Sequence, residues 1–172
     1  AHACSQPGFG IDHHARAMCM YNEPYFRKLL ALLQKAKLGV VSDPHTGPLH
    51  ARVKDLLAAN SRVCLGQDDV ADAYYPFGQN NALEVGFLNV HLLWMTTFPE
   101  METLYDMITK TPAQLIGLQD FEIKEGAPAN LVVLDQPNVL EALRFHEKPS
   151  YVISHGNLVD QLQMDKILKE NS

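Results

Sequence analysis

The sequence has few cysteines and no excess of basic residues, and each shortage excludes a class of protein. Its three cysteines, Cys4, Cys19 and Cys64, form no Cys-x-x-Cys pair and are odd in number. This usage is typical of a reduced, cytoplasmic protein and not of a disulfide-stapled secreted one. The net charge of −6 argues against nucleic acid or an anionic membrane surface as a partner, because both need a basic face.

Long apolar runs are absent as well. The longest, residues 85–95, is interrupted by Asn89 and His91, whereas a helix that spans a bilayer needs about 20 predominantly apolar residues. No secretory leader is visible, and the sequence opens on alanine, so we expect its true start to lie upstream. The 172 residues, 47% hydrophobic and 20% charged, predict one globular domain, or one domain with a small appendage.

The order of apolar segments is typical of a parallel α/β structure. Helices are expected where apolar residues recur at helical spacing, and strands where short, β-branched apolar runs end in turn residues. Thr111-Pro112 predicts the start of one helix, as cap and first-turn residue. Such alternation predicts a parallel sheet with helical crossovers. The expected helices are 23–38, 49–59, 82–95, 101–107 and 112–118, and the expected strands are 39–44 and 63–65.

The C-terminal part of the chain has a different character. A turn-rich stretch at 122–130 precedes a compact strand at 131–135, and a short helix is expected at 139–145. Residues 151–159 form two apolar segments around His155-Gly156-Asn157, whose turn residues predict a β-hairpin. We therefore divide the chain into a helix-and-strand part at 1–118 and a C-terminal β part at 119–172.

Three side chains in the apolar segments are expected in the core. His91 lies within an apolar helix, where a buried, hydrogen-bonded role is about four times as common as a site. Trp94 is expected as a core aromatic, and Cys64 as a small core residue. Cys19 is expected to be buried in the same way.

The run from Gly66 to Gly78 (GQDDVADAYYPFG) is the most informative stretch of the chain. It follows the apolar segment Ser61–Leu65, so Asp68 lies where a buried strand ends and its loop begins. In an α/β barrel the carboxyl ends of the strands surround the active site. A carboxylate there can bind a metal or hold a proton near a bound water. Taken alone, Asp68-Asp69 favours a simple turn by roughly two to one.

Several segments together resemble the C-terminal half of amidohydrolase-superfamily enzymes. Among these the chain is most similar to the bacterial, barrel-type cytosine deaminases and relatives that act on cyclic amides and amines. The resemblance runs from about His14 to the C-terminus, and it implies the C-terminal portion of a (β/α)8 barrel, a small terminal β-sandwich and one divalent metal ion, zinc or iron. The segments are Asp68-Asp69-Val70, Tyr75–Gly78 (YPFG), Thr109–Leu118 (TKTPAQLIGL), Ile123–Gly126 (IKEG) and Ala129–Asp135 (ANLVVLD).

The resemblance implies roles for four residues. Asp68 matches the carboxylate after the last barrel strand, which ligates the metal and shuttles the proton of the attacking water. His14 matches a histidine that touches the metal-bound water, although His13 replaces the family's serine beside it. Tyr74 matches an aromatic position, usually tryptophan, that lines the pocket of a small heterocyclic substrate. Asp69 matches a neighbouring polar position in the same pocket.

Other ligands of the family have no counterpart in this sequence. No two histidines have the His-x-His spacing of the first strand, and residues 1–6 lack the His-x-x-Glu spacing of the fifth. Because catalytic zinc has about three protein ligands, Asp68 and His14 do not complete a site. Three hypotheses stay open. The chain is part of a metal-dependent amidohydrolase, or a non-catalytic relative that serves as a binding or structural module, or a half-barrel that assembles with a partner chain or with itself.

Overall fold

The computed structural model describes residues 15–44, 50–68, 70, 72–73 and 75–159. It confirms the prediction of an α/β structure. No described helix is both long and apolar enough to cross a membrane. The elements are η1 (Ala15–Met20), α1 (Glu23–Ala36), β1 (Val40–Ser42), α2 (Val53–Ala58), β2 (Val63–Leu65), α3 (Ala82–Leu92), α4 (Phe98–Ile108), α5 (Lys110–Leu115), β3 (Leu131–Val133), α6 (Val139–Phe145), β4 (Tyr151–Ser154) and β5 (Asn157–Leu158).

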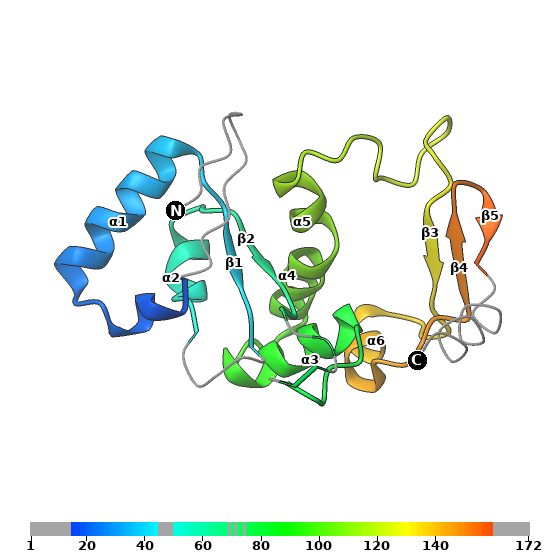
Figure 1. Ribbon diagram of the computed structural model, residues 1–172, viewed down its shortest axis with the longest axis horizontal. Coiled ribbons are helices and arrows are strands. Elements are labelled where there is room, and N and C mark those ends of the chain that lie inside the picture. Colours follow the sequence, from blue (N-terminus) through cyan, green and yellow to red (C-terminus); the bar gives the residue numbers. More distant parts are fainter. Residues whose placement is uncertain (1–14, 45–49, 69, 71, 74, 160–172) are drawn as a thin grey trace.

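Strands β1 and β2 form a parallel pair in the middle of the structure (Figure 1). Val40 lies opposite Val63 and Ser42 opposite Leu65. Helix α2 makes the crossover that parallel neighbours require. Two parallel strands with a helical crossover are consistent with part of a (β/α)8 barrel. The main core, built from these strands and the surrounding helices, contains Met18, Phe26, Leu33, Val40, Val53, Leu56, Val63, Leu65, Leu104 and Met107.

Local signals in the sequence explain where two of the helices begin. At α1 the Asn22 side chain accepts a hydrogen bond from the Tyr25 N–H at 3.0 Å. Helix α4 begins at Phe98, earlier than expected, because Thr97 and Glu100 form a capping box. In that box Glu100 accepts bonds from the Thr97 N–H at 3.0 Å and from its hydroxyl at 2.7 Å.

The predicted start of α5 is wrong. The helix begins at Lys110, so Thr111 is already helical and does not cap it. Thr109 occupies the cap position, and its hydroxyl donates instead to the Tyr105 carbonyl at 2.7 Å. Helices α4 and α5 therefore follow each other with a single residue between them, and Pro112 lies in the first turn, where a missing N–H costs no helical bond.

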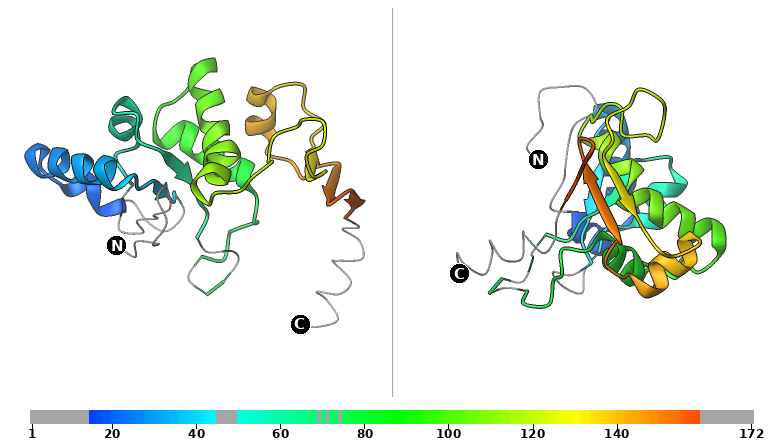
Figure 2. Two further views of the ribbon diagram at one scale, coloured as in Figure 1. Left: turned by 90° about the horizontal axis from the view of Figure 1, so that it is seen from above. Right: turned by 90° about the vertical axis from the view of Figure 1, so that its right-hand side faces the viewer.

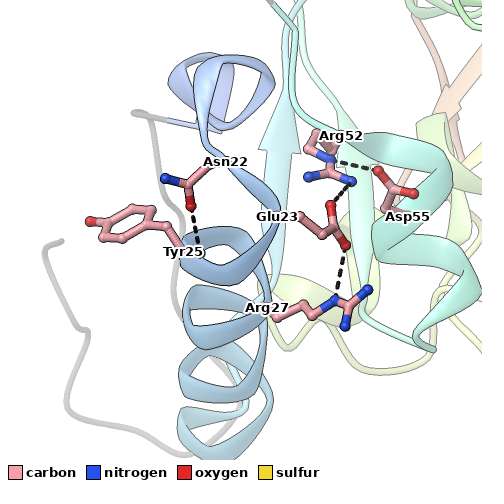
Figure 3. A network of polar contacts seen from close by, with 6 residues as sticks. All are labelled: Asn22, Glu23, Tyr25, Arg27, Arg52 and Asp55. Carbon is pink, nitrogen blue, oxygen red and sulfur yellow. Dashed lines mark hydrogen bonds and ion pairs between the residues drawn. The ribbon is translucent and has the colours of Figure 1, made fainter.

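A network around Arg52 ties α1 to the start of α2 (Figure 3). The Arg52 guanidinium donates to Asp55 at 2.6 Å and to Glu23 at 2.9 Å, and it lies 3.9 Å from the centre of the Phe26 ring. Arg27 adds a bond to Glu23 at 3.1 Å. Hydrogen bonds from Arg52 and then Arg27 lower the pKa of Glu23. The crossover between β1 and β2 is thereby fixed against the helix that precedes β1.

The C-terminal elements lie at the opposite end of the molecule from α1, in Figure 1 and in the left view of Figure 2. Helix α6 packs on α3 and α4 through a second cluster that contains Leu83, Met101, Ala142 and Leu143. Strands β3, β4 and β5 form an antiparallel sheet in that order. The predicted hairpin is confirmed, since β4 and β5 pair around His155 and Gly156, both at positive φ.

Three of the predicted core side chains are exposed instead. Trp94, beyond the end of α3, is 78% exposed, and His91 is exposed with its ring edge-on to Phe87 at 4.9 Å. The segment is mostly apolar, but the helices α4 and α6 that pack on α3 leave these two side chains uncovered. Cys19 is also exposed. Cys64 is buried in β2 as predicted, and this burial raises the pKa of its thiol to about 11.

Candidate functional site

The candidate site begins at the carboxyl end of β2. The Gly66 N–H donates to the Ser42 carbonyl at 3.0 Å, so the bonding between β1 and β2 continues one residue past the strand. Asp68 follows two residues later, exposed, with a left-handed φ of 63°. Aspartate is one of the few residues that adopt this conformation readily. Asp68 therefore lies just beyond a buried strand, where the sequence predicted it, with its carboxylate accessible.

Two more polar side chains belong to the same edge of the sheet. Asp43 directly follows β1, whereas Gly66 and Gln67 separate Asp68 from β2. The apolar strand could have indicated Asp43, but we did not single it out. The side-chain nitrogen of Gln67 is buried and has no hydrogen-bond partner within the described part of the chain. The edge is also tightly packed, because a Cβ on Gly66 would lie 3.0 Å from Val41 Cγ1. Polar side chains therefore lie together at the carboxyl ends of the two parallel strands.

The other predicted site residues, His14, Asp69 and Tyr74, lie outside the described residues. The structure describes only the segments next to them. Element η1 begins at Ala15, immediately after His14, and contacts β1, while its Met18 is buried in the main core. The chain that follows His14 is therefore anchored beside the parallel pair. The roles of all three residues stay predictions.

The loop after Asp68 presents aromatic surface. The Asp72 carboxylate accepts a bond from the Tyr75 N–H at 2.8 Å, which ties these two loop residues together. The rings of Tyr75 and Phe77 lie edge to face with centres 5.7 Å apart, and Phe77 is 72% exposed. In the left view of Figure 2 the described part of this loop extends from the sheet on the side away from α4. Neither ring is singled out by the sequence, where both residues belong to the family motif Tyr75–Gly78.

The far end of the loop is held in place by Asn81. Its side-chain oxygen accepts from the Leu83 N–H at 3.0 Å and so caps α3. Its amide group donates to the His146 carbonyl at 2.6 Å, which lies at the end of α6. The loop therefore runs between two fixed points, the end of β2 and the packed start of α3.

The described residues alone do not build a metal centre. Among them, no group of three or more His, Cys, Asp or Glu side chains lies close enough together to hold an ion. Asp68 is the one described member of the predicted ligand set, and catalytic zinc needs about three protein ligands. A metal would therefore need ligands from outside the described part of the chain.

Comparisons with known proteins show which family the chain belongs to. The family model described as the amidohydrolase family matches residues 5–160. The chain is 27% identical over 119 residues to N-isopropylammelide isopropyl amidohydrolase from Pseudomonas sp. (strain ADP), which covers 69% of this chain and 28% of that protein.

Two solved structures share the fold over most of the chain. One is 5-methylcytosine deaminase from Klebsiella pneumoniae liganded with 5-fluorocytosine, with a TM-score of 0.76 and 30% identity over 84% of this chain and 38% of that one. The other is N-isopropylammelide isopropylaminohydrolase from Burkholderia multivorans, with a TM-score of 0.76 and 25% identity over 83% and 37%. The chain thus spans less than two fifths of these relatives, and the match over residues 5–160 shows that it belongs to the amidohydrolase family.

Proposed function

We propose that this chain contributes the last-strand carboxylate, Asp68, to a metal-dependent hydrolase. Its reaction is hydrolytic deamination of a heterocyclic amine, or the opening of a related cyclic amide. The observation that carries the proposal is the position of Asp68 at the start of the loop that follows the buried strand β2, within a segment that matches the amidohydrolase family. The similarity to a 5-methylcytosine deaminase and to two ammelide-acting enzymes supports a small heterocycle as the substrate.

Asp68 has properties that suit proton transfer. In a hydrolytic deamination, water adds to the ring carbon that bears the amine, the carbon–nitrogen bond breaks, and ammonia leaves. One group that takes a proton from the attacking water and returns it to the leaving nitrogen serves both steps. The Asp68 carboxylate is exposed, so substrate and water can reach it, while the bond between Gly66 and Ser42 fixes the backbone close by. We assign both transfers to Asp68.

The proposal of a bound metal rests only on the chain's membership of the amidohydrolase family. We propose one divalent ion, zinc or iron, with Asp68 and His14 as the ligands that this chain supplies. The described residues do not complete its coordination, so no step of the proposed chemistry is assigned to it. Its remaining ligands would come from the part of the family fold that lies outside this chain.

The loop after β2 is the proposed substrate-binding element. Tyr74 and Asp69 are its predicted contacts. Among their described neighbours, Phe77 exposes its ring, and the half-buried Tyr75 packs edge to face against it. Flat heterocycles pack well against such rings, in offset-stacked or edge-to-face arrangements. The loop therefore suits a planar, aromatic substrate better than an extended or highly charged one.

A second candidate function is a binding or structural module without catalysis. The observation that favours it is the lack of a three-ligand group among the described residues. Metal content separates the two candidates, because a catalytic relative should hold close to one equivalent of metal once its ligand set is complete, and a module should hold none.

The test is a chimera in which this chain replaces the matching segment of the Klebsiella 5-methylcytosine deaminase. Metal content is measured by elemental analysis, and ammonia release on a panel of cyclic amines. We expect bound metal and turnover, and a loss of at least ~10²-fold when the same chimera carries Asp68→Asn. Turnover that Asp68→Asn leaves unchanged would contradict the assignment. A folded chimera that binds metal but releases no ammonia would favour the non-catalytic module.

A further inference from the structure

The side chain of Asn81 makes two hydrogen bonds, and only one of them serves the helix that it begins. Its oxygen accepts from the Leu83 N–H at 3.0 Å and caps α3. Its nitrogen donates to the His146 carbonyl at 2.6 Å, a residue 65 positions away in the sequence. Aspartate caps a helix as well as asparagine does, but an ionised carboxylate has no hydrogen to donate. The bond to His146 is therefore a second role, separate from the cap.

His146 is a fixed acceptor for this bond. It ends α6 in the left-handed region, at a φ of 36°. Its ring stacks on Phe87 of α3, with the ring centres 4.8 Å apart and the planes 28° from parallel. Helix α6 also approaches α3 closely, because a Cβ on Gly86 would lie 2.6 Å from Leu143 Cδ2. The last carbonyls of a helix have no partner inside it, and Asn81 provides one for His146.

Asn81 is the nearer of the two fixed points to the aromatic part of the loop after β2. Phe77, whose ring is 72% exposed, precedes Asn81 by four residues and follows Gly66 by eleven. Four residues span at most ~14 Å, whereas eleven residues span up to ~40 Å. The bond at Gly66 therefore leaves the Phe77 ring many positions, and the bond at Asn81 leaves it few. Asp68, only two residues after Gly66, depends on the other fixed point.

We infer that Asn81 is a positioning residue for the substrate, which acts through the His146 carbonyl and makes the end of α6 a determinant of substrate affinity. This inference rests on the proposed function, in which the loop after β2 binds the substrate ring. A loop that is already held in place loses less conformational freedom on binding than a mobile one. A contact that is the same before and during the reaction contributes to binding alone. Loss of the bond should therefore weaken binding and leave the chemical step unchanged.

The test replaces Asn81 with aspartate in the chimera of this chain and the Klebsiella 5-methylcytosine deaminase. Asn81→Asp keeps the cap oxygen and the size of the side chain, and a negative charge is favourable at the start of a helix. We expect KM to rise about fivefold, as for one lost hydrogen bond, and kcat to change by less than about twofold. Asn138→Asp is the matched control, because Asn138 caps α6 by accepting from the Glu141 N–H at 2.9 Å. It should leave both constants unchanged.

The mobility of the loop is measured separately in the 172-residue chain, by NMR relaxation of the backbone amides. In Asn81→Asp we expect the order parameters of Phe77 and Gly78 to fall from about 0.85 towards the ~0.6 of flexible backbone. In Asn138→Asp they should stay unchanged. Thermal unfolding reports whether each variant is folded. If Asn81→Asp does not fold, Asn81→Ser takes its place, since serine also caps a helix and its hydroxyl lies one bond short of the amide nitrogen.

Three results would overturn the inference. They are a KM that Asn81→Asp leaves unchanged, a KM that Asn138→Asp raises equally, and a loop whose mobility is the same in Asn81→Asp as in the unaltered chain. An unaltered chimera that releases no ammonia would instead contradict the proposed function. The mobility of the loop then decides alone whether Asn81 positions it, so the two failures are distinguishable.

Discussion

The Gly66 N–H donates to the Ser42 carbonyl at 3.0 Å, one residue beyond the end of β2. This bond places the last fixed point of the parallel pair two residues before Asp68, whose φ of 63° turns the chain into the loop. The exposed Asp68 carboxylate thus lies close to a stretch of backbone that is fixed by hydrogen bonds. Asparagine tolerates the left-handed conformation as well as aspartate does, so the charge of residue 68 can be removed without straining the backbone.

Asp68→Asn should therefore lower the turnover of the enzyme without lowering the stability of the chain. In the assembled enzyme we expect turnover to fall by at least ~10²-fold, because asparagine keeps the shape but cannot accept the proton. The melting temperature of this chain should stay nearly unchanged, since residue 68 is exposed. Steady-state kinetics and thermal unfolding measure the two effects. Near-normal turnover with metal still bound would show that Asp68 is only a turn residue.

Tyr74 should contribute to substrate binding more than to chemistry. Stacking on an aromatic ring is worth about 1 kcal/mol, so Tyr74→Ala should raise KM several-fold with a smaller effect on kcat. Tyr74→Phe should be mild if the ring alone matters, and severe if the hydroxyl bonds the substrate. Phe98→Ala, 67% exposed at the start of α4 and outside this loop, is the matched control for loss of exposed aromatic surface. Wild-type behaviour of both Tyr74 variants on every substrate would place Tyr74 outside the pocket.

Short-range signals made much of the fold predictable. Strand Val63–Leu65 and helix Val139–Phe145 have the bounds that the sequence indicated, because β-branched runs and helical apolar spacing are local properties. The resemblance to the amidohydrolase family is confirmed by the family model that matches residues 5–160. The division of the chain at residue 118 and the roles of Asp68, His14, Asp69 and Tyr74 stay predictions.

The exposed side chains were missed because burial depends on partners far away in the sequence. Trp94 and His91 belong to an apolar segment, yet their exposure is set by how much of α3 is covered by α4 and α6. The start of α5 was missed because Thr109 bonds back to Tyr105 in α4. A local sequence pattern cannot show whether such a competing acceptor lies within reach.

The buried side chain of Leu143 should contribute strongly to the packing of α6 on the rest of the chain. It is 1% exposed in the cluster that joins α6 to α3 and α4, so Leu143→Ala should destabilise the chain by about 2–5 kcal/mol through lost contacts and a cavity. Phe145→Ala, in the same helix but half exposed, should cost much less. Urea unfolding of the two variants checks this, and equal costs would mean that α6 is not held by this cluster.

Acid should weaken the chain in part through Glu23 and Glu100. Arg52 and Arg27 lower the pKa of Glu23 below its ordinary 4.5, and hydrogen bonds from the Thr97 backbone and hydroxyl lower that of Glu100. The folded state thus binds these protons less readily than the unfolded state. The stabilisation by these two carboxylates is complete above pH 4.5 and is lost as the pH falls through their lowered pKa values.

Melting temperatures from pH 7 to pH 3 should fall less steeply in Glu23→Gln and Glu100→Gln than in the unaltered chain. Glu102→Gln, exposed on α4, controls for the loss of a charge alone. Parallel curves for all four proteins would show that neither contact contributes to acid sensitivity.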